Sequence, residues 1–170
     1  MKMEKEAFYD MSYGLYIITS KFKDEFAGCI VNTVVQATAE EKPKLVVIVN
    51  KENTTNEIMK KSKKVNISTL SKDVDMLLIG KFGFRNSREF DKLKDTKYIM
   101  GENNIPVVTE NVVSYVEADI IDEIDTGTHT VFILESTNSK KISYEEPLTY
   151  KYYHEVIKGK TPPKASSFSR

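Results

Sequence analysis

The amino-acid sequence predicts a mainly β protein, an antiparallel barrel with short flanking helices. Six segments have the alternation or the apolar run length of strands, whereas three have helical spacing. The two strongest strand segments lie on either side of Asp125-Thr126-Gly127-Thr128, a turn-like cluster that suits a hairpin. Many strands with few helices are typical of a barrel.

The expected elements follow one another with neither an internal repeat nor a linker, so residues 1–170 are expected to form a single domain. Strands are expected at residues 13–19, 27–38, 45–49, 65–70, 112–124 and 130–136. Helices are expected at residues 55–63, 73–81 and 149–157, and the last has Tyr150, Tyr153, His154 and Ile157 on one face. Residues 158–170 contain Gly159, Pro162 and Pro163, which predicts an extended C-terminal tail.

Composition limits the classes of function. Lys plus Arg equals Asp plus Glu at 25 each, so no overall field attracts nucleic acid or an anionic membrane, and neither is expected as a partner. Cys29 is the sole cysteine, which rules out an internal disulfide and any multi-cysteine metal site, and no metal is expected. With neither a signal peptide nor a membrane span in the sequence, a cytoplasmic protein is expected.

A candidate anion site lies where the strand at 45–49 ends and the helix at 55–63 begins. Thr54 and Glu57 have the spacing of a capping box, and free N–H groups at the helix start would face a phosphate. Lys51 could add a positive charge, and Asn53 and Thr55 could add neutral donors. The alternative is that a threonine merely caps the helix while Lys51 points into solvent.

A second segment, residues 27–38, mixes polar and apolar side chains within one strand pattern. A planar polar ligand needs an apolar wall for its faces and hydrogen-bonding groups along its edge, which such a strand supplies. The candidates are Ile30, Val31, Asn32, Thr33 and Val34 here, with Val49 and Asn50 from the next strand. Polar residues that merely pair across strands on the wetter face of the sheet explain this pattern equally well.

Two further candidates are less specific. In residues 82–93, Arg88 or Lys92 could reach a phosphate. Surface arginines that pair with Glu89 and Asp91, while the Phe residues anchor a loop, explain the segment equally well. His129 follows the Gly127-Thr128 turn and is the single candidate proton donor, but a histidine at a strand end is more often structural.

Cys29 is expected to be buried. The sequence contains neither a dinucleotide-binding glycine fingerprint nor a P-loop.

Taken in order, six segments resemble the flavin reductase-like FMN-binding family, particularly flavoredoxins and the flavin domain of high-molecular-weight rubredoxins. They are SYGLYIITS (12–20), NTVVQAT (32–38), VNKEN (49–53), FGF (82–84), GTHT (127–130) and KGKTPPKA (158–165). Each segment is short and degenerate, so the resemblance depends on their order and spacing along nearly the whole chain.

The resemblance implies a split β-barrel, a homodimer and FMN bound without a covalent link. It places residues 32–34 and 49–51 near the flavin ring and ribityl chain, and Asn53, Thr55 and either Arg88 or Lys92 near the phosphate. In this family NADH or NADPH docks directly over the flavin, and His129 would line the nicotinamide side. Relatives often carry an acid just before this histidine, where this chain has Thr128, which weakens the expected role of the imidazole.

The implied activity is that of an NAD(P)H-dependent flavin reductase, which passes electrons to free flavin or to an acceptor protein. Rubredoxin-fused relatives continue beyond the PPKA segment into an iron domain, so any such acceptor is expected to be a separate molecule. The alternative is a flavoredoxin-like carrier that moves electrons between rubredoxin- or ferredoxin-type partners without oxidising NAD(P)H. A third possibility is a binding module of the same barrel class that holds another planar ligand, such as haem.

Overall fold

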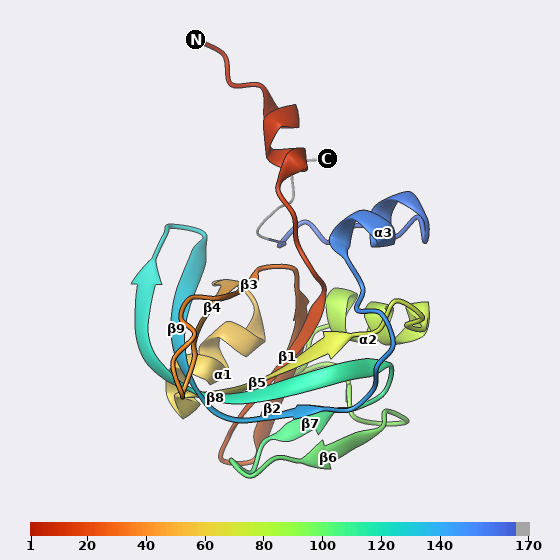
Figure 1. Ribbon diagram of the computed structural model, residues 1–170. Helices are drawn as coiled ribbons and strands as arrows, with labels where there is room; N and C mark the ends of the chain where they lie inside the picture. The colour runs from red at the N-terminus through yellow and green to blue at the C-terminus, as the bar shows by residue number, and fades with distance from the viewer. Residues whose placement is uncertain (166–170) are drawn as a thin grey trace.

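Seven antiparallel strands form one curled sheet, a half-barrel, in the computed structural model, which describes residues 1–165 (Figure 1). Their order across the sheet is β2-β1-β5-β8-β9-β4-β3. The strands are β1 Tyr16–Phe22, β2 Glu25–Val31, β3 Val34–Gln36, β4 Lys44–Asn50, β5 Lys64–Leu70, β8 Val112–Asp125 and β9 His129–Lys141. A two-stranded ribbon, β6 Tyr98–Met100 and β7 Pro106–Val108, packs against β1 and β5.

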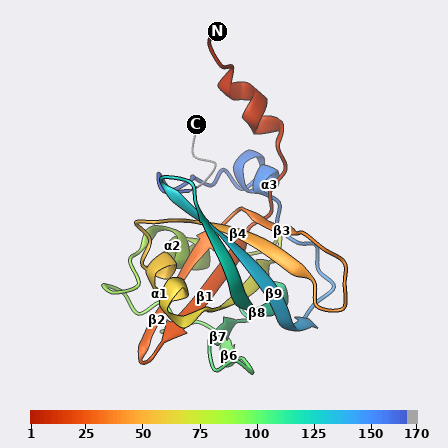
Figure 2. The same cartoon turned by 90° about the vertical axis from the view of Figure 1, so that its left-hand side faces the viewer.

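Short helices flank the sheet. They are the 3₁₀ helix η1 Lys5–Asp10 and the α-helices α1 Thr54–Ser62, α2 Met76–Phe84 and α3 Tyr150–Glu155. Both views place α3 and the segment that follows it, residues 158–165, at one end of the barrel, on the side of the projecting η1 (Figures 1 and 2). The mainly β architecture is therefore confirmed, and five of the six predicted strands are present with shifted bounds.

The two edge strands of the sheet are joined by only two residues, Asn32 and Thr33, between the end of β2 and the start of β3. In a flat sheet, six strand spacings would hold these edges about 29 Å apart. A two-residue connection reaches about 11 Å. The sheet must therefore curl until its edges approach. The Ile48 amide donates to the Thr33 carbonyl at 3.3 Å and so continues the β3–β4 ladder as far as this connection.

The prediction of one continuous strand over residues 27–38 is wrong, because the chain changes partners at Asn32. Before it, β2 pairs with β1, and after it, β3 pairs with β4. The Thr33 hydroxyl donates to Asn32 Oδ1 at 2.9 Å, a local bond of the kind that competes with a strand ladder. The short strands β6 and β7 and the helix η1 were not predicted, since three to six residues carry too little periodicity.

The barrel interior is filled by alternate residues of the strands. Leu45, Val47 and Val49 of β4 point inward and pack with Phe132 and Leu134 of β9. A second cluster, built around Leu78, Ile79 and Phe82 of α2, packs on the other side of β1 and includes Tyr153 of α3. These two clusters hold α2 and α3 at the end of the barrel where the predicted site residues gather.

The C-terminal tail is confirmed as non-helical where it can be followed. Residues 158–165 contain neither helix nor strand, and the rest of the predicted tail, 166–170, lies outside the described residues. The helix predicted at 149–157 is shorter than expected, but Tyr150, Tyr153 and Ile157 do pack on the second cluster. The tail therefore leaves the barrel from a fixed helix.

Phe132 is a direct test of the barrel interior, because its side chain is 0% exposed. We expect Phe132→Ala to lower the free energy of unfolding by about 3 to 5 kcal/mol, since it removes buried apolar area and leaves a cavity. Urea unfolding followed by circular dichroism measures this change. The matched control is Leu77→Ala on α2, where the side chain is 79% exposed, and a similar loss in both variants would contradict the assigned core.

Candidate functional site

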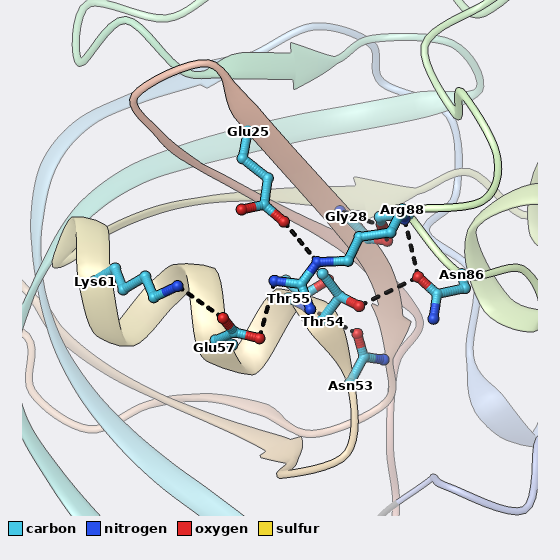
Figure 3. Close-up of polar contacts among 10 residues, drawn as sticks. Glu25, Gly28, Asn53, Thr54, Thr55, Glu57, Lys61, Asn86 and Arg88 are labelled. Atoms are coloured by element: carbon cyan, nitrogen blue, oxygen red, sulfur yellow. Dashed lines mark hydrogen bonds and ion pairs between the residues drawn. The ribbon is translucent and has the colours of Figure 1, made fainter.

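The junction between β4 and α1 is the centre of the candidate site (Figure 3). Asn50 ends β4 opposite His129, and the Lys51 amide donates to the Thr128 carbonyl at 3.0 Å. The chain then turns sharply, and Asn53 caps α1 by accepting from the Thr55 amide at 3.0 Å. The positive end of the α1 dipole therefore faces the region between β2, β4 and the β8–β9 hairpin.

The predicted capping box of Thr54 and Glu57 is wrong. Asn53 holds the cap position, and the Thr54 hydroxyl instead donates to Asn86 Oδ1 at 3.2 Å. The Glu57 carboxylate instead pairs with two cations. Arg88 Nη2 lies 3.0 Å from one of its oxygens and Lys61 Nζ lies 2.7 Å from the other. These contacts, Arg88 first, lower the pKa of the Glu57 carboxyl to about 2.

Residues 86–88 lie beside α1 and β2 and make polar contacts with both (Figure 3). Arg88 lies between two acids, Glu57 and Glu25, whose carboxylate accepts from its Nε at 2.7 Å. Ser87 exchanges two hydrogen bonds of 3.2 Å with the backbone of Gly28. Arg88 therefore lies beside the start of α1, as the phosphate hypothesis requires, but both of its neighbouring carboxylates already engage its charge.

Lys92 lies behind β2 and is 2% exposed. Its ammonium donates to the carbonyl oxygens of Gly28 at 2.6 Å and Phe82 at 3.1 Å, and burial lowers its pKa to about 8. The nearby Cys29 is buried in the barrel core as expected, and burial raises the pKa of its thiol. Lys92 thus links β2 to α2, because its ammonium donates to one backbone carbonyl of each element.

Two adjoining cavities open between β2, β4, α3 and the C-terminal tail. Ile30, Asn32 and Asn53 line both cavities, together with Lys164 and Ala165 of the tail. Val31, Val49 and Asn50 line the cavity nearer β4. Six of the predicted binding residues, from two separate stretches of the chain, are therefore brought to one cleft.

The remaining predicted residues lie around this cleft in different ways. Thr33 and Val34 continue directly from its wall into β3. Lys51 stands at the hairpin and pairs with Asp125, which lowers the pKa of that carboxyl. Thr55 is fully buried, and its hydroxyl has no well-formed hydrogen bond. It lies near the Cys29 thiol and acts to lower the pKa of that thiol, against the larger effect of burial.

His129 opens β9 beside the β4–α1 junction. Its Nδ1 lies 2.8 Å from the Thr128 hydroxyl, which takes the place that an acidic neighbour was expected to fill. Its Nε2 is buried and has no hydrogen-bond partner within residues 1–165. A buried polar atom without a partner is costly, so this nitrogen is suited to meet a ligand atom.

Sequence reasoning missed the contribution of α3 and the tail to the site. Tyr150, Tyr153, Thr161 and Lys164 line the larger cavity, yet none was a candidate. The KGKTPPKA segment was part of the resemblance, and that was the one signal that could have found them. Within the described chain, no cluster of three or more His, Cys, Asp or Glu side chains could hold a metal ion. Likewise, none of the helices described for residues 1–165 is both long and apolar enough to cross a membrane.

A curled antiparallel half-barrel, with a strand-to-helix junction beside a cleft of polar and apolar residues, is typical of the split-barrel class of flavin-binding proteins. Comparison with known families agrees, because residues 8–156 match the family model described as "Flavin reductase like domain". The chain belongs to the flavin reductase-like family.

Two curated relatives align along nearly the whole chain. A ferric-chelate reductase (NAD(P)H) of Archaeoglobus fulgidus is 42% identical over 98% of this chain and 98% of its own length. A high molecular weight rubredoxin of Moorella thermoacetica is 39% identical over 98% of this chain and 72% of its own length. The family assignment is therefore supported by the sequence over the full extent of the fold.

Solved structures agree on the fold. An NADH:FAD oxidoreductase of Streptomyces globisporus, SgcE6, aligns with a TM-score of 0.75 and 18% identity over 84% of each chain. Flavin reductase HpaC, in complex with NADP+, aligns with a TM-score of 0.72 and 23% identity over 86% of this chain and 90% of its own. A Sinorhizobium meliloti structure has a TM-score of 0.75 and 20% identity over 88% of this chain, which covers 51% of that one.

The ion pairs of Glu57 predict a particular response to acid. Because its folded pKa is depressed from 4.5 to about 2, the stabilisation is present above pH 4.5 and is lost as the pH falls towards 2. We therefore expect Glu57→Gln to be less stable than the wild type near neutral pH, and this difference to shrink in acid. Urea unfolding of both proteins at several pH values measures it. A difference that stays constant with pH would show that the carboxylate charge is not what holds Arg88.

Proposed function

We propose that this protein binds FMN without a covalent link in the cleft between β2, β4 and α1 and acts as an NAD(P)H-dependent flavin reductase. The observation that carries the proposal is the convergence of Asn32, Asn50 and Asn53 on one cleft, with His129 paired opposite Asn50, in a chain of this family. The 42% identical relative is named for NAD(P)H-dependent reduction, which supports the same donors here.

The side chains around the cleft fit such a ligand. His129, which pairs across strands with the lining residue Asn50, has a buried Nε2 without a hydrogen-bond partner in the described chain. The buried Thr55 hydroxyl lies near Cys29, which also lines the cleft. Asn32 and Asn53 contribute amide groups to the lining, while Ile30 and Val49 contribute apolar surface. A flavin needs this combination, since its faces are apolar and its pyrimidine edge and phosphate are polar.

The phosphate end lies at the start of α1. The helix dipole favours an anion there, and Asn53 orients the first turn by capping the Thr55 amide. Arg88 stands beside this turn and raises the local positive potential, although Glu25 and Glu57 balance much of its charge. Lys92 acts at longer range, because its ammonium is held by two backbone carbonyls.

The ring end lies against the turn that joins the two sheet edges. Asn32 and Thr33 present polar groups to the edge of the ring, and Val31, Val34 and Val49 form apolar wall. Bound FMN supplies a group that accepts a hydride from NADH or NADPH and passes the electrons onward. The protein holds both partners in contact, and the low polarity of the wall excludes water from between them.

His129 lies on the nicotinamide side of the cleft. Thr128 fixes the imidazole through Nδ1, which leaves Nε2 directed to a ligand. Lys51 and Asp125 tie the hairpin turn to the β4–α1 junction and so hold the histidine in place.

The chain forms a homodimer in this proposal. The outer half of the β8–β9 hairpin extends beyond the sheet and exposes Ile121 and Ile124, and the edge strand β3 exposes Val35 (Figure 1). A contiguous exposed apolar patch is typical of a protein interface, and these three side chains are the candidates to form one. Sedimentation equilibrium of the purified protein tests it, and a monomer at micromolar concentration would contradict it.

A second candidate function is that of an electron carrier between proteins, without direct oxidation of NAD(P)H. The 39% identical relative named high molecular weight rubredoxin favours it, since that name implies an iron-containing electron partner. A separate rubredoxin- or ferredoxin-type protein would then exchange electrons with the flavin at the open cleft.

Anaerobic reduction separates these functions. We expect the FMN-loaded protein to lose its visible flavin absorption when mixed with NADH or NADPH. Bleaching by a reduced ferredoxin but by neither nucleotide would overturn the reductase and support the carrier. A protein that is colourless as purified and cannot be loaded with FMN would contradict both, and a haem spectrum would identify a different ligand.

His129→Gln tests the nicotinamide side. We expect the rate of flavin reduction by NADH to fall by about tenfold, as for loss of one hydrogen bond to the bound nucleotide. The dissociation constant for FMN should stay nearly unchanged, because the phosphate end of the site is intact. Tyr144→Gln, at a side chain that is 96% exposed and lines neither cavity, is the control. Equal effects of both substitutions would remove His129 from the site.

A further inference from the structure

We propose that Lys164 is a further ligand of the flavin phosphate, delivered to the start of α1 by the C-terminal strap, defined here as Gly159–Ala165. The inference rests on the proposed function, because it takes FMN as the occupant of the cleft. It adds to that proposal a binding residue more than a hundred positions away from α1 in the sequence, and it gives the strap a role.

The strap is held in a defined place by α3. The Tyr153 hydroxyl donates to the Lys160 carbonyl at 2.8 Å, and the Gly159 amide donates to the Tyr153 carbonyl at 2.9 Å. Thr161 Oγ1 lies 2.8 Å from His154 Nε2. Gly159 is required here, because a Cβ at that position would lie 2.0 Å from the Tyr153 ring. The strap therefore enters the cleft along a fixed path.

This path brings Lys164 to the anion end of the cleft. Lys164 lines both cavities together with Asn32 and Asn53, and Asn53 is the residue that caps α1. Its Nζ lies 3.3 Å from Glu52 Oε2, directly before that cap. A cation and the positive end of a helix repel each other weakly, and a phosphate between them would be attracted by both.

Lys164 is also the cation that is easiest to redirect. The other cations near this end, Lys51, Arg88 and Lys92, are each engaged by carboxylate or carbonyl oxygens at shorter distances. The only ion pair described for Lys164 is with Glu52, whose side chain is 72% exposed. An exposed pair of this kind contributes little, so Lys164 can exchange Glu52 for a doubly charged phosphate at small cost.

The test compares FMN with riboflavin, which has the same ring and no phosphate, by quenching of flavin fluorescence at fixed ionic strength. We expect Lys164→Gln to weaken FMN binding by about tenfold, as for loss of a charge-assisted hydrogen bond, and to leave riboflavin binding unchanged. Lys158→Gln is the matched control, because it removes an equal charge from an exposed residue that lines neither cavity. It should leave both dissociation constants unchanged.

Glu52→Gln distinguishes a phosphate ligand from a simple latch. If Lys164 binds phosphate, removing its competing carboxylate should leave FMN binding at least as tight as in the wild type. If the ion pair merely pins the strap, Glu52→Gln should weaken binding as Lys164→Gln does, and the inference is overturned. Equal weakening of FMN and riboflavin, no effect on either, or an effect confined to the KM for NADPH would also overturn it. Failure of the wild type to bind any flavin would instead refute the proposed function itself.

Discussion

The closure of the sheet at Asn32 and Thr33 is the constraint on which the rest of the structure depends. Two residues join strands that occupy opposite edges of a seven-stranded sheet, so the sheet can exist only as a curled half-barrel. The same turn brings polar groups to the place where β2 and β4 approach each other. Fold and cleft therefore have a common physical origin, because Asn32, which interrupts the ladder, also lines the cleft.

Around this closure, each neighbouring element is tied to the cleft by contacts of its own. The β8–β9 hairpin contacts the β4–α1 junction at Lys51, whose amide donates to the Thr128 carbonyl and whose ammonium pairs with Asp125. These contacts hold His129 opposite the end of β4. The loop containing Arg88 joins α1 to β2 through Glu57 and Glu25. Charges in this region are mostly paired within the protein. An incoming anion is therefore met chiefly by the helix dipole and by groups that can change partner.

Much of this could be predicted from the sequence, and the exceptions have physical causes. Periodicity located most of the strands, and the strand-to-helix pattern at residues 49–58 located the junction of β4 and α1. The sequence pattern could not reveal that Asn53 caps α1. The Thr54 hydroxyl is engaged by Asn86 and the Glu57 carboxylate by Arg88, and both partners are distant in the sequence. Nor could it reveal that Lys92 faces carbonyl groups, or that the tail returns across the cleft, since tertiary packing decides both.

A crystal structure of the full chain with FMN tests the central claim most directly. The claim is that the turn closing the barrel and the helix that follows β4 form one flavin site. The account predicts the phosphate within hydrogen-bond distance of the first turn of α1, with the ring edge against Asn32 and Thr33. A flavin bound elsewhere, for example in the space between η1 and α3, would contradict it.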